Sequence, residues 1–184
     1  MALTKSASLT LGAKPPPFSL PATDGRTYTL ESFPDAKALM VVFMCNHCPY
    51  VLAWLDRIAL LARECAPEGL KTVGISANDP VAFPDDSFPK MKEFARQKKL
   101  PFPYLFDESQ KVARAYGATC TPDIFVYDAG RRLAYHGRVD DNHEDPKQVK
   151  RQDLREALTL ILAGKPAPAR QEPSMGCNVK WKAS

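Results

Sequence analysis

The chain has 184 residues, a formal net charge of +4 and 45% apolar residues, which is enough for one ordinary domain with a buried core. Its basic residues are scattered and form no stripe or known motif, so we expect no binding to nucleic acid. No run of about 18 apolar residues is present, so we expect no membrane-spanning segment.

The start of the chain and its cysteine content set the expected location. The first residues lack a charged start followed by an apolar stretch, so we expect no secretory signal. Five cysteines are an odd number, which favours reactive thiols in a reducing compartment over a framework of structural disulfides. We therefore expect a cytoplasmic protein, although a secreted chain whose signal has been removed would look the same.

The elements are predicted to follow the order βαβα(βα)ββα after a small N-terminal hairpin that turns at Asp24-Gly25. The expected long strands cover residues 38–44, 70–76, 102–106, 123–127 and 133–139. The expected helices cover residues 49–66, 87–99, 108–116 and 149–163. Apolar runs indicate the strands, and apolar residues at helical spacing indicate the helices.

This order predicts an α/β fold with one central mixed β-sheet flanked by helices on both faces. The first strand, helix and strand form a right-handed unit with parallel strands. The final two strands form an antiparallel hairpin through Asp128-Ala129-Gly130. We expect one domain over residues 1–164, because Gly164 ends the last helix, and a C-terminal tail over residues 165–184.

The most informative motif is Cys45-Asn46-His47-Cys48, which lies where the first long strand passes into a helix. A thiol at a helix N-terminus meets unpaired N–H groups and the positive end of the helix dipole, which lower its pKa. We expect Cys45 to be exposed and to be the more acidic thiol. Two packed cysteines or two zinc ligands are the alternatives, but no second Cys/His pair in the sequence completes a four-ligand zinc site.

Three segments carry a resemblance to a known family: residues 12–20, residues 45–50 with the CxxC motif, and residues 116–123 with Thr121-Pro122. Over residues 11–163 the sequence resembles the thioredoxin-like superfamily, in its redoxin (AhpC/TSA-type) and peroxiredoxin-like branch. The resemblance implies a thioredoxin-like fold with an N-terminal β-hairpin extension. It also implies that the Thr121-Pro122 bond is cis and faces the CxxC motif.

The resemblance also assigns roles to the residues of the motifs. Cys45 is expected to attack a substrate disulfide, Cys48 to resolve the mixed disulfide, and His47 to tune the Cys45 thiolate. Pro122 is expected to shape the substrate groove, where the backbone of Thr121 pairs with an extended substrate. Thr121 and Asn46 are thus the expected substrate-binding residues.

The other three cysteines divide into candidates and a core residue. Cys120 lies next to Pro122 and is either a third redox thiol, a metal ligand or a small buried residue. Cys177 is either a resolving thiol on a mobile tail or an unpaired bystander. Cys65 lies among apolar residues late in the first helix and is expected to pack in the core.

The chain departs from the family in two places. When Cys48-Pro49 is placed on the end of the peroxiredoxin pattern Pro-x-x-x-Thr-x-x-Cys-Pro, Cys45 replaces the Thr and Val41 replaces the first Pro. The hydroxyl that binds peroxide is therefore missing, and peroxidase activity is expected to be weak. The buried Asp that relays protons in thioredoxin falls at Leu39.

The sequence therefore predicts a thiol–disulfide oxidoreductase that needs no cofactor and no resident metal. Its partners would be protein disulfides or a thiol reductant, and the oligomeric state stays open. One alternative is a peroxiredoxin-like thiol peroxidase that uses Cys48 or Cys45. The other is a metal-binding or metal-delivery module in which Cys45, Cys48 and either His47 or Cys120 hold copper(I) or zinc.

Overall fold

The structure is a computed structural model that describes residues 3–183, and a five-stranded mixed sheet with the order β6-β5-β4-β8-β9 lies at its centre. β4 (Ala38–Phe43) pairs in parallel with β5 (Leu70–Ser76), which pairs in parallel with β6 (Tyr104–Phe106). On its other side β4 pairs antiparallel with β8 (Asp123–Tyr127), and β8 pairs antiparallel with β9 (Leu133–His136). The mixed sheet expected from the sequence is confirmed.

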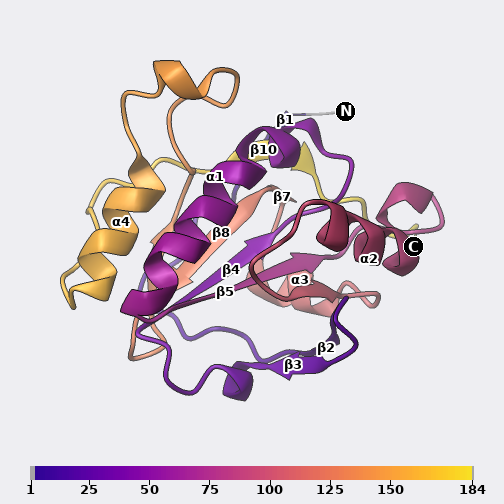
Figure 1. Ribbon diagram of the computed structural model, residues 1–184, viewed down its shortest axis with the longest axis horizontal. Helices are drawn as coiled ribbons and strands as arrows, with labels where there is room; N and C mark the ends of the chain where they lie inside the picture. Colours follow the sequence, from indigo (N-terminus) through magenta and orange to yellow (C-terminus); the bar gives the residue numbers. More distant parts are fainter. Residues whose placement is uncertain (1–2, 184) are drawn as a thin grey trace.

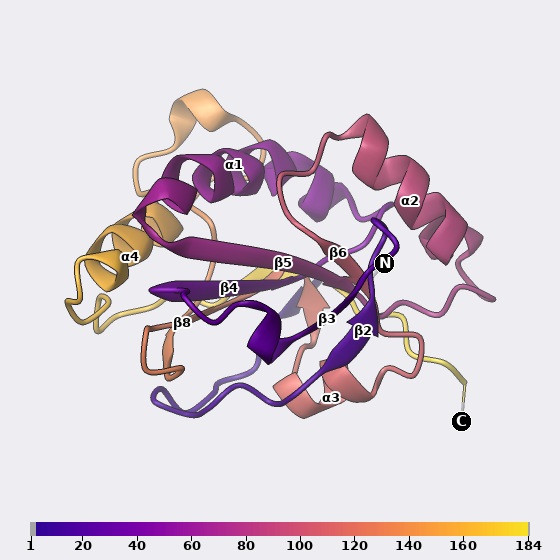
Figure 2. The ribbon, with the colours of Figure 1, turned by 60° about the horizontal axis from the view of Figure 1, so that its bottom comes forward.

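Helices cover both faces of this sheet, as expected (Figures 1 and 2). α1 (Pro49–Cys65), α2 (Phe88–Gln97) and α4 (Asp153–Leu162) pack on one face, while α3 (Lys111–Tyr116) packs on the other. Every residue of β4 is buried, because alternate side chains enter different cores. Met40 and Val42 belong to the core on the side of α1, and Leu39, Val41 and Phe43 belong to the core that contains α3.

The predicted N-terminal hairpin consists of β2 (Ser19–Pro21) and β3 (Thr27–Thr29), which pair antiparallel. Gly25 in its turn has a φ of +87°, a conformation that glycine adopts without strain. Leu20 enters the core on the side of α3, so the hairpin covers that face of the sheet beside the helix (Figure 2).

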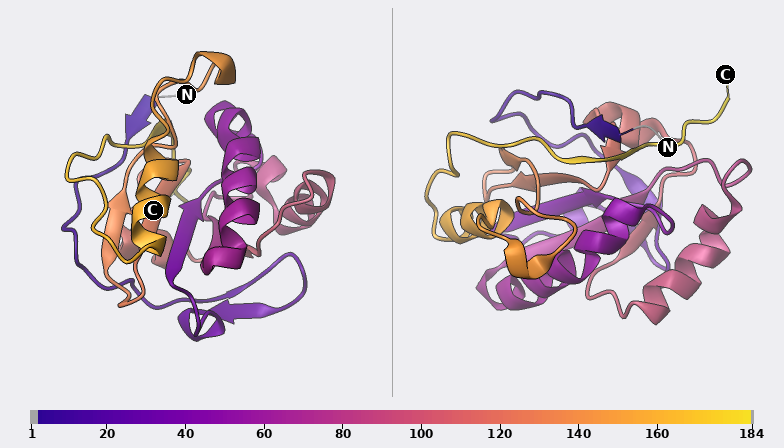
Figure 3. Two further views of the ribbon diagram at one scale, coloured as in Figure 1. Left: turned by 60° about the vertical axis from the view of Figure 1, so that its left-hand side comes forward. Right: turned by 90° about the horizontal axis from the view of Figure 1, so that it is seen from above.

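A second sheet joins the two ends of the chain to the domain. β1 (Leu3–Lys5), β10 (Met175–Asn178) and β7 (Cys120–Thr121) pair antiparallel in the order β1-β10-β7. The N-terminal and C-terminal segments therefore run side by side across one end of the central sheet (Figure 3). The sequence predicts only a tail after residue 164, but β10 within that segment is paired on both edges and partly buried.

The close approach of β10 to β7 requires a glycine. A Cβ atom on Gly176 would lie 2.0 Å from the carbonyl oxygen of Thr121, far inside van der Waals contact. The backbone of β10 consequently rests directly on the residue before Pro122. No helix within residues 3–183 combines the length and the apolar character needed to cross a membrane.

We predict that Gly176→Ala destabilises the protein by about 1–3 kcal/mol, because overpacking against a rigid backbone carbonyl forces β10 away from β7. Urea unfolding measures this loss. Gly130→Ala is the matched control: its Cβ would lie 3.3 Å from a side-chain oxygen of Asp128, and a change within about 0.5 kcal/mol is expected. Equal effects of the two substitutions would contradict the close packing of β10.

Candidate active site

The two thiols of the CxxC motif lie at the junction of β4 and α1, and both are buried. Cys45 follows the end of β4, and Cys48 is the N-cap residue of α1, whose first residue is Pro49. Cys45 is 1% exposed and Cys48 is 0% exposed. The prediction that Cys45 is exposed is therefore wrong, because two loops and β10 pack over the junction.

The first of these loops contains the predicted cis bond. The Thr121-Pro122 peptide bond is cis, which confirms the expectation. The antiparallel register places Asp123 opposite Phe43, so this loop meets the end of β4 at the motif. Thr121 Oγ1 lies 3.7 Å from Cys45 Sγ, and Cys48 Sγ lies 3.1 Å from the Thr121 carbonyl oxygen, to which it donates a hydrogen bond in its protonated form.

The backbone edge of Thr121 is already occupied. β10 pairs with β7 so that Cys177 lies opposite Thr121 and Asn178 lies opposite Cys120. The prediction that this edge is free for a substrate strand is therefore wrong in this structure. Cys177 is 3% exposed and lies in a strand rather than on a mobile tail, and it belongs to the same buried cluster as Cys45 and Cys48.

The surroundings of Cys48 favour its thiolate. Its pKa is lowered, mainly by a hydrogen bond from the Cys45 thiol and further by hydrogen bonds from the Thr121 side chain, the Val51 N–H group and the Cys177 thiol, which together outweigh burial. The Val51 N–H is one of the unpaired donors in the first turn of α1. Cys48 is therefore the thiol that the helix N-terminus activates.

The surroundings of Cys45 favour its protonated form. Its pKa is raised well above the usual value by its hydrogen bond with Cys48, by burial, and by the negative charge of Asp86. The hydrogen bond with Thr121 acts in the opposite direction and is weaker. The structure thus reverses the predicted order of acidity, which named Cys45 as the more acidic thiol.

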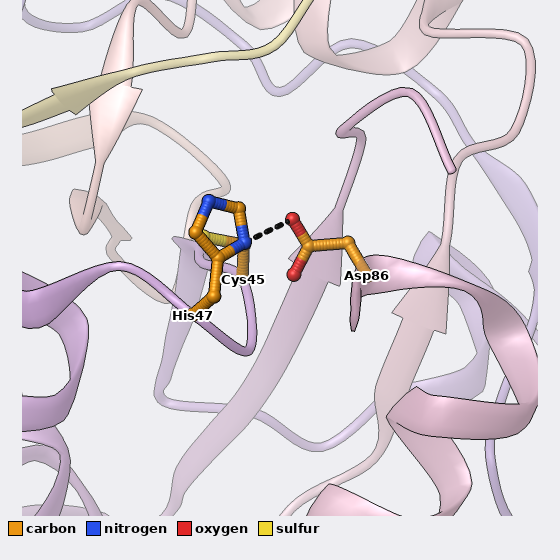
Figure 4. A group of neighbouring side chains, drawn as sticks. All are labelled: Cys45, His47 and Asp86. Carbon is orange, nitrogen blue, oxygen red and sulfur yellow. Dashed lines mark ion pairs between the residues drawn. The ribbon is translucent and has the colours of Figure 1, made fainter. Parts of the chain in front are cut away.

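His47 is paired with a buried carboxylate that the sequence analysis missed. His47 Nδ1 lies 2.8 Å from Asp86 Oδ2, with Asp86 completely buried and the His47 side chain 22% exposed. The two side chains point toward each other beside Cys45 (Figure 4). The imidazole ring stacks on Phe83 at a centroid distance of 5.7 Å. His47 thus contacts the carboxylate whose negative charge bears on Cys45.

Hydrogen bonds to both of its oxygens hold Asp86 in place. The backbone N–H of Asn46 donates to Oδ1 at 2.8 Å, and Asn78 Nδ2 donates to Oδ2 at 2.7 Å. Asp86 lies in the proline-containing loop between β5 and α2, next to the exposed Asp85. No pattern in the sequence distinguishes these two acidic residues, so the sequence alone does not identify Asp86 as the partner of His47.

Asn46, predicted to bind substrate, is used inside the protein. Its Nδ2 donates to the Asp85 carbonyl oxygen at 2.7 Å, and its Oδ1 accepts from the Tyr104 hydroxyl at 3.0 Å. Together with its N–H bond to Asp86, these contacts fasten the CxxC turn to the neighbouring loop. Asn46 therefore positions the motif in this structure and does not present its amide to a substrate.

A metal ion fits this group poorly. Cys45, His47 and Asp86 each offer one ligand atom, and these atoms lie within 4.8 Å of one another. Zinc bonds of about 2.0–2.1 Å in a tetrahedron separate nitrogen and oxygen ligands by roughly 3.3 Å. The 2.8 Å between His47 Nδ1 and Asp86 Oδ2 is instead the distance of an ion pair.

Cys120 and Cys65 differ from the other cysteines in their surroundings. Cys120 is fully buried with its thiol 3.6 Å from the Pro122 carbonyl oxygen, and burial raises its pKa. Cys65 packs in the core at the end of α1, as expected, and burial also raises its pKa. Neither thiol is activated at neutral pH.

A pocket of about 220 Å³ opens beside the motif. Its lining includes Asn46 and His47 from the CxxC turn, Asp85 from the loop, and Lys90 and Glu93 from α2. The turn between the two thiols therefore forms part of a surface hollow that carries charges of both signs.

Comparison with known proteins bears on the fold and on the chemistry. Residues 11–136 match the model of the AhpC/TSA family. The chloroplastic peroxiredoxin Q of Sedum lineare is 30% identical over 125 residues, which are 68% of this chain and 62% of that protein. The matched region thus spans less than two thirds of the relative's length.

Two solved structures extend the comparison to most of the chain. A hypothetical protein from Sinorhizobium meliloti 1021 has 44% identity and a TM-score of 0.94, with 98% of this chain and 100% of that chain covered. A thioredoxin-family thiol:disulfide interchange protein from Chlorobium tepidum TLS has 20% identity and a TM-score of 0.64, with 84% and 99% covered. The thioredoxin-like fold expected from the sequence is confirmed.

We predict that the reduced protein carries a Cys48 thiolate at neutral pH. At neutral pH an ordinary cysteine, with a pKa of about 8.5, is mostly protonated. A lowered pKa keeps Cys48 deprotonated until the pH falls through that lower value. The ultraviolet absorbance of thiolates, followed against pH, measures this. Cys48→Ser should remove the signal and Cys65→Ser should preserve it; a signal that survives Cys48→Ser would refute the assignment.

We also predict that Asp86→Asn lowers the pKa of Cys45, because it removes a buried negative charge that disfavours the Cys45 thiolate. The rate of alkylation of Cys45 against pH, measured in a Cys48→Ser background, should shift to lower pH. Asp85→Asn is the control, since Asp85 is exposed and contacts the motif through its backbone carbonyl. A shift of equal size in both variants would exclude a specific effect of Asp86.

Proposed function

Because the chain belongs to the AhpC/TSA family, we propose that it is a thiol–disulfide oxidoreductase whose redox centre is the Cys45–Cys48 pair. Family membership makes the protein a thiol redox enzyme. The specific reaction, the roles of the two thiols and the class of substrate are the proposal.

One observation carries this assignment: both thiols of the motif lie against Thr121, with Cys45 Sγ 3.7 Å from its hydroxyl and Cys48 Sγ 3.1 Å from its carbonyl oxygen. Two cysteines that share one turn and one neighbour can form a disulfide with little movement of the backbone. The more acidic of the two lies at a helix N-terminus, where thiolates are stabilised. The pair therefore combines a nucleophile with a neighbouring resolving thiol.

The order of acidity supports a cycle that begins at Cys48. The Cys48 thiolate attacks one sulfur of a substrate disulfide, and the other substrate sulfur leaves as a thiolate. Cys45 then loses its proton and attacks Cys48 Sγ, which forms the Cys45–Cys48 disulfide and releases the second substrate thiolate. A thiol reductant reverses the sequence. Cys48 replaces Cys45 as the proposed attacking residue, because exchange rates depend on the thiolate fraction.

The surroundings of the pair favour small reactants. β10 covers the backbone edge of Thr121 where a peptide substrate would pair, and both thiols are buried. The pocket of about 220 Å³ beside Asn46 and His47 admits a small disulfide or a small thiol. A protein disulfide would first have to displace β10.

A thiol peroxidase is the second candidate, and a contact outside the sequence motif favours it. The peroxiredoxin pattern places a Thr where this chain has Cys45, but the Thr121 hydroxyl lies 3.7 Å from Cys45 Sγ. Thr121 thus supplies a hydroxyl from a different strand. The Cys48 thiolate would attack one peroxide oxygen and become a sulfenic acid while the other oxygen leaves as hydroxide, and Cys45 would then condense with the sulfenic acid to form the disulfide and water.

We predict that glutathione disulfide converts reduced wild-type protein to the internal disulfide without a stable adduct. Cys45→Ser should instead accumulate a glutathione adduct on Cys48, because the resolving thiol is absent. Cys48→Ser should react more slowly by a factor of roughly ten or more, since the remaining thiol has a raised pKa. Intact mass and free-thiol counts measure these products, and Cys65→Ser should match the wild type.

The same variants separate the two candidates. Faster oxidation of the wild type by hydrogen peroxide than by glutathione disulfide would promote the peroxidase. A stable adduct on Cys45 in Cys48→Ser, formed as fast as the one on Cys48 in Cys45→Ser, would overturn the assigned order. If neither oxidant forms the Cys45–Cys48 disulfide in the folded wild type, the proposed redox centre is refuted.

A further inference from the structure

The C-terminal strand β10 places a third thiol at the redox centre. Cys177 lies opposite Thr121 in the β10–β7 pair, and Cys48 Sγ lies 3.1 Å from the carbonyl oxygen of the same Thr121. Cys48 therefore shares one buried cluster with two other thiols, Cys45 from the end of β4 and Cys177 from β10. The family match ends at residue 136, so the segment that carries Cys177 lies outside the matched region.

We infer that Cys177 is a third redox residue that exchanges disulfides with Cys48, so that β10 serves as a built-in substrate strand. Extended substrates add to exposed strand edges through main-chain hydrogen bonds. β10 occupies the edge at Thr121 in this manner and presents a cysteine to the pair that we propose to be the redox centre. The inference rests on the proposed function and deepens it.

The exchange conserves atoms and electrons. Starting from the Cys45–Cys48 disulfide, Cys177 Sγ loses its proton and attacks Cys48 Sγ. The Cys48–Cys177 bond forms, the Cys45–Cys48 bond breaks, and Cys45 leaves with the electron pair and takes up the proton. One disulfide and one thiol are present before and after the step, so it needs no outside oxidant or reductant.

The packing of β10 sets the geometry of this exchange. Gly176 lets the strand rest on the Thr121 carbonyl, since any Cβ there would collide with it. Pairing with β1 on the other edge holds the strand from outside, with Cys177 opposite Leu3. The thiol of Cys177 is thus delivered to Cys48 by two strand pairings and by the absence of a side chain at residue 176.

Cys120 provides the internal comparison, because it belongs to the same strand pair. It lies opposite Asn178, and its thiol is directed to the Pro122 carbonyl oxygen at 3.6 Å. Proximity of strands alone therefore does not place a thiol on Cys48. The inference therefore predicts that Cys177, and not Cys120, forms a disulfide with Cys48.

Disulfide mapping in the full-length Cys45→Ser variant tests this inference. Oxidation with diamide, alkylation of free thiols and digestion with trypsin under non-reducing conditions separate the cysteines. Cys48 falls in the peptide of residues 38–57, Cys177 in 171–180, Cys120 in 115–131 and Cys65 in 64–71. We expect a crosslink between peptides 38–57 and 171–180, and its complete loss in Cys45→Ser/Cys177→Ser.

The outcomes distinguish this inference from the proposed function. Folding of each variant is checked by circular dichroism, and Cys45→Ser/Cys120→Ser, which should keep the crosslink, guards against a general effect of removing a buried thiol. A crosslink from 38–57 to 115–131, or none in folded Cys45→Ser, would overturn the role of Cys177. The assignment of Cys45 and Cys48 as the redox centre is kept if the wild type forms the Cys45–Cys48 disulfide within peptide 38–57, and is refuted if it does not.

Discussion

The antiparallel pairing of β4 with β8 is the constraint on which the site depends. It brings the end of one strand and the start of the other to the same edge of the sheet, with Phe43 opposite Asp123. The Cys45 turn and the Thr121-Pro122 loop consequently meet, although they are far apart in the sequence. The register also explains why both thiols contact Thr121: a shift by one residue would turn every side chain of the strand to the opposite face.

Once the thiols are buried, neighbouring groups decide which of them holds a proton. The pKa of Cys48 is lowered by its neighbours Cys45, Thr121, the first turn of α1 and Cys177, while the charge of the buried Asp86 helps to raise the pKa of Cys45. A buried carboxylate is costly unless it is paired and hydrogen-bonded, and His47, Asn46 and Asn78 meet that condition. The CxxC turn thus carries both the reactive sulfurs and the groups that stabilise the charge beside them.

The sequence predicts those features that local patterns determine. The strand Ala38–Phe43 and helix Pro49–Cys65 follow from apolar runs and spacing, the CxxC motif marks their junction, and Thr121-Pro122 marks the cis bond. The errors concern tertiary packing. Burial of Cys45, the pairing of β10 and the choice of Asp86 over Asp85 each depend on contacts between distant segments. A four-residue strand that contains a glycine has no periodic signal, so β10 was predicted only as part of a tail.

The C-terminal strand also determines which reactants can approach the site. A strand tethered to its own domain competes at a high effective concentration, in the millimolar range for short flexible connections, so an external peptide must displace a partner that is always present. The pairing of β10 with β1 and the burial of Cys177 stabilise its docked position further. A protein substrate that displaces β10 would have to replace both of these interactions. A small disulfide, thiol or peroxide needs only the space beside His47 and a brief opening of the thiols. Under the proposed function, the same strand would exclude large reactants and place a thiol where a substrate cysteine would lie, so that one structural element would link selectivity to the internal exchange.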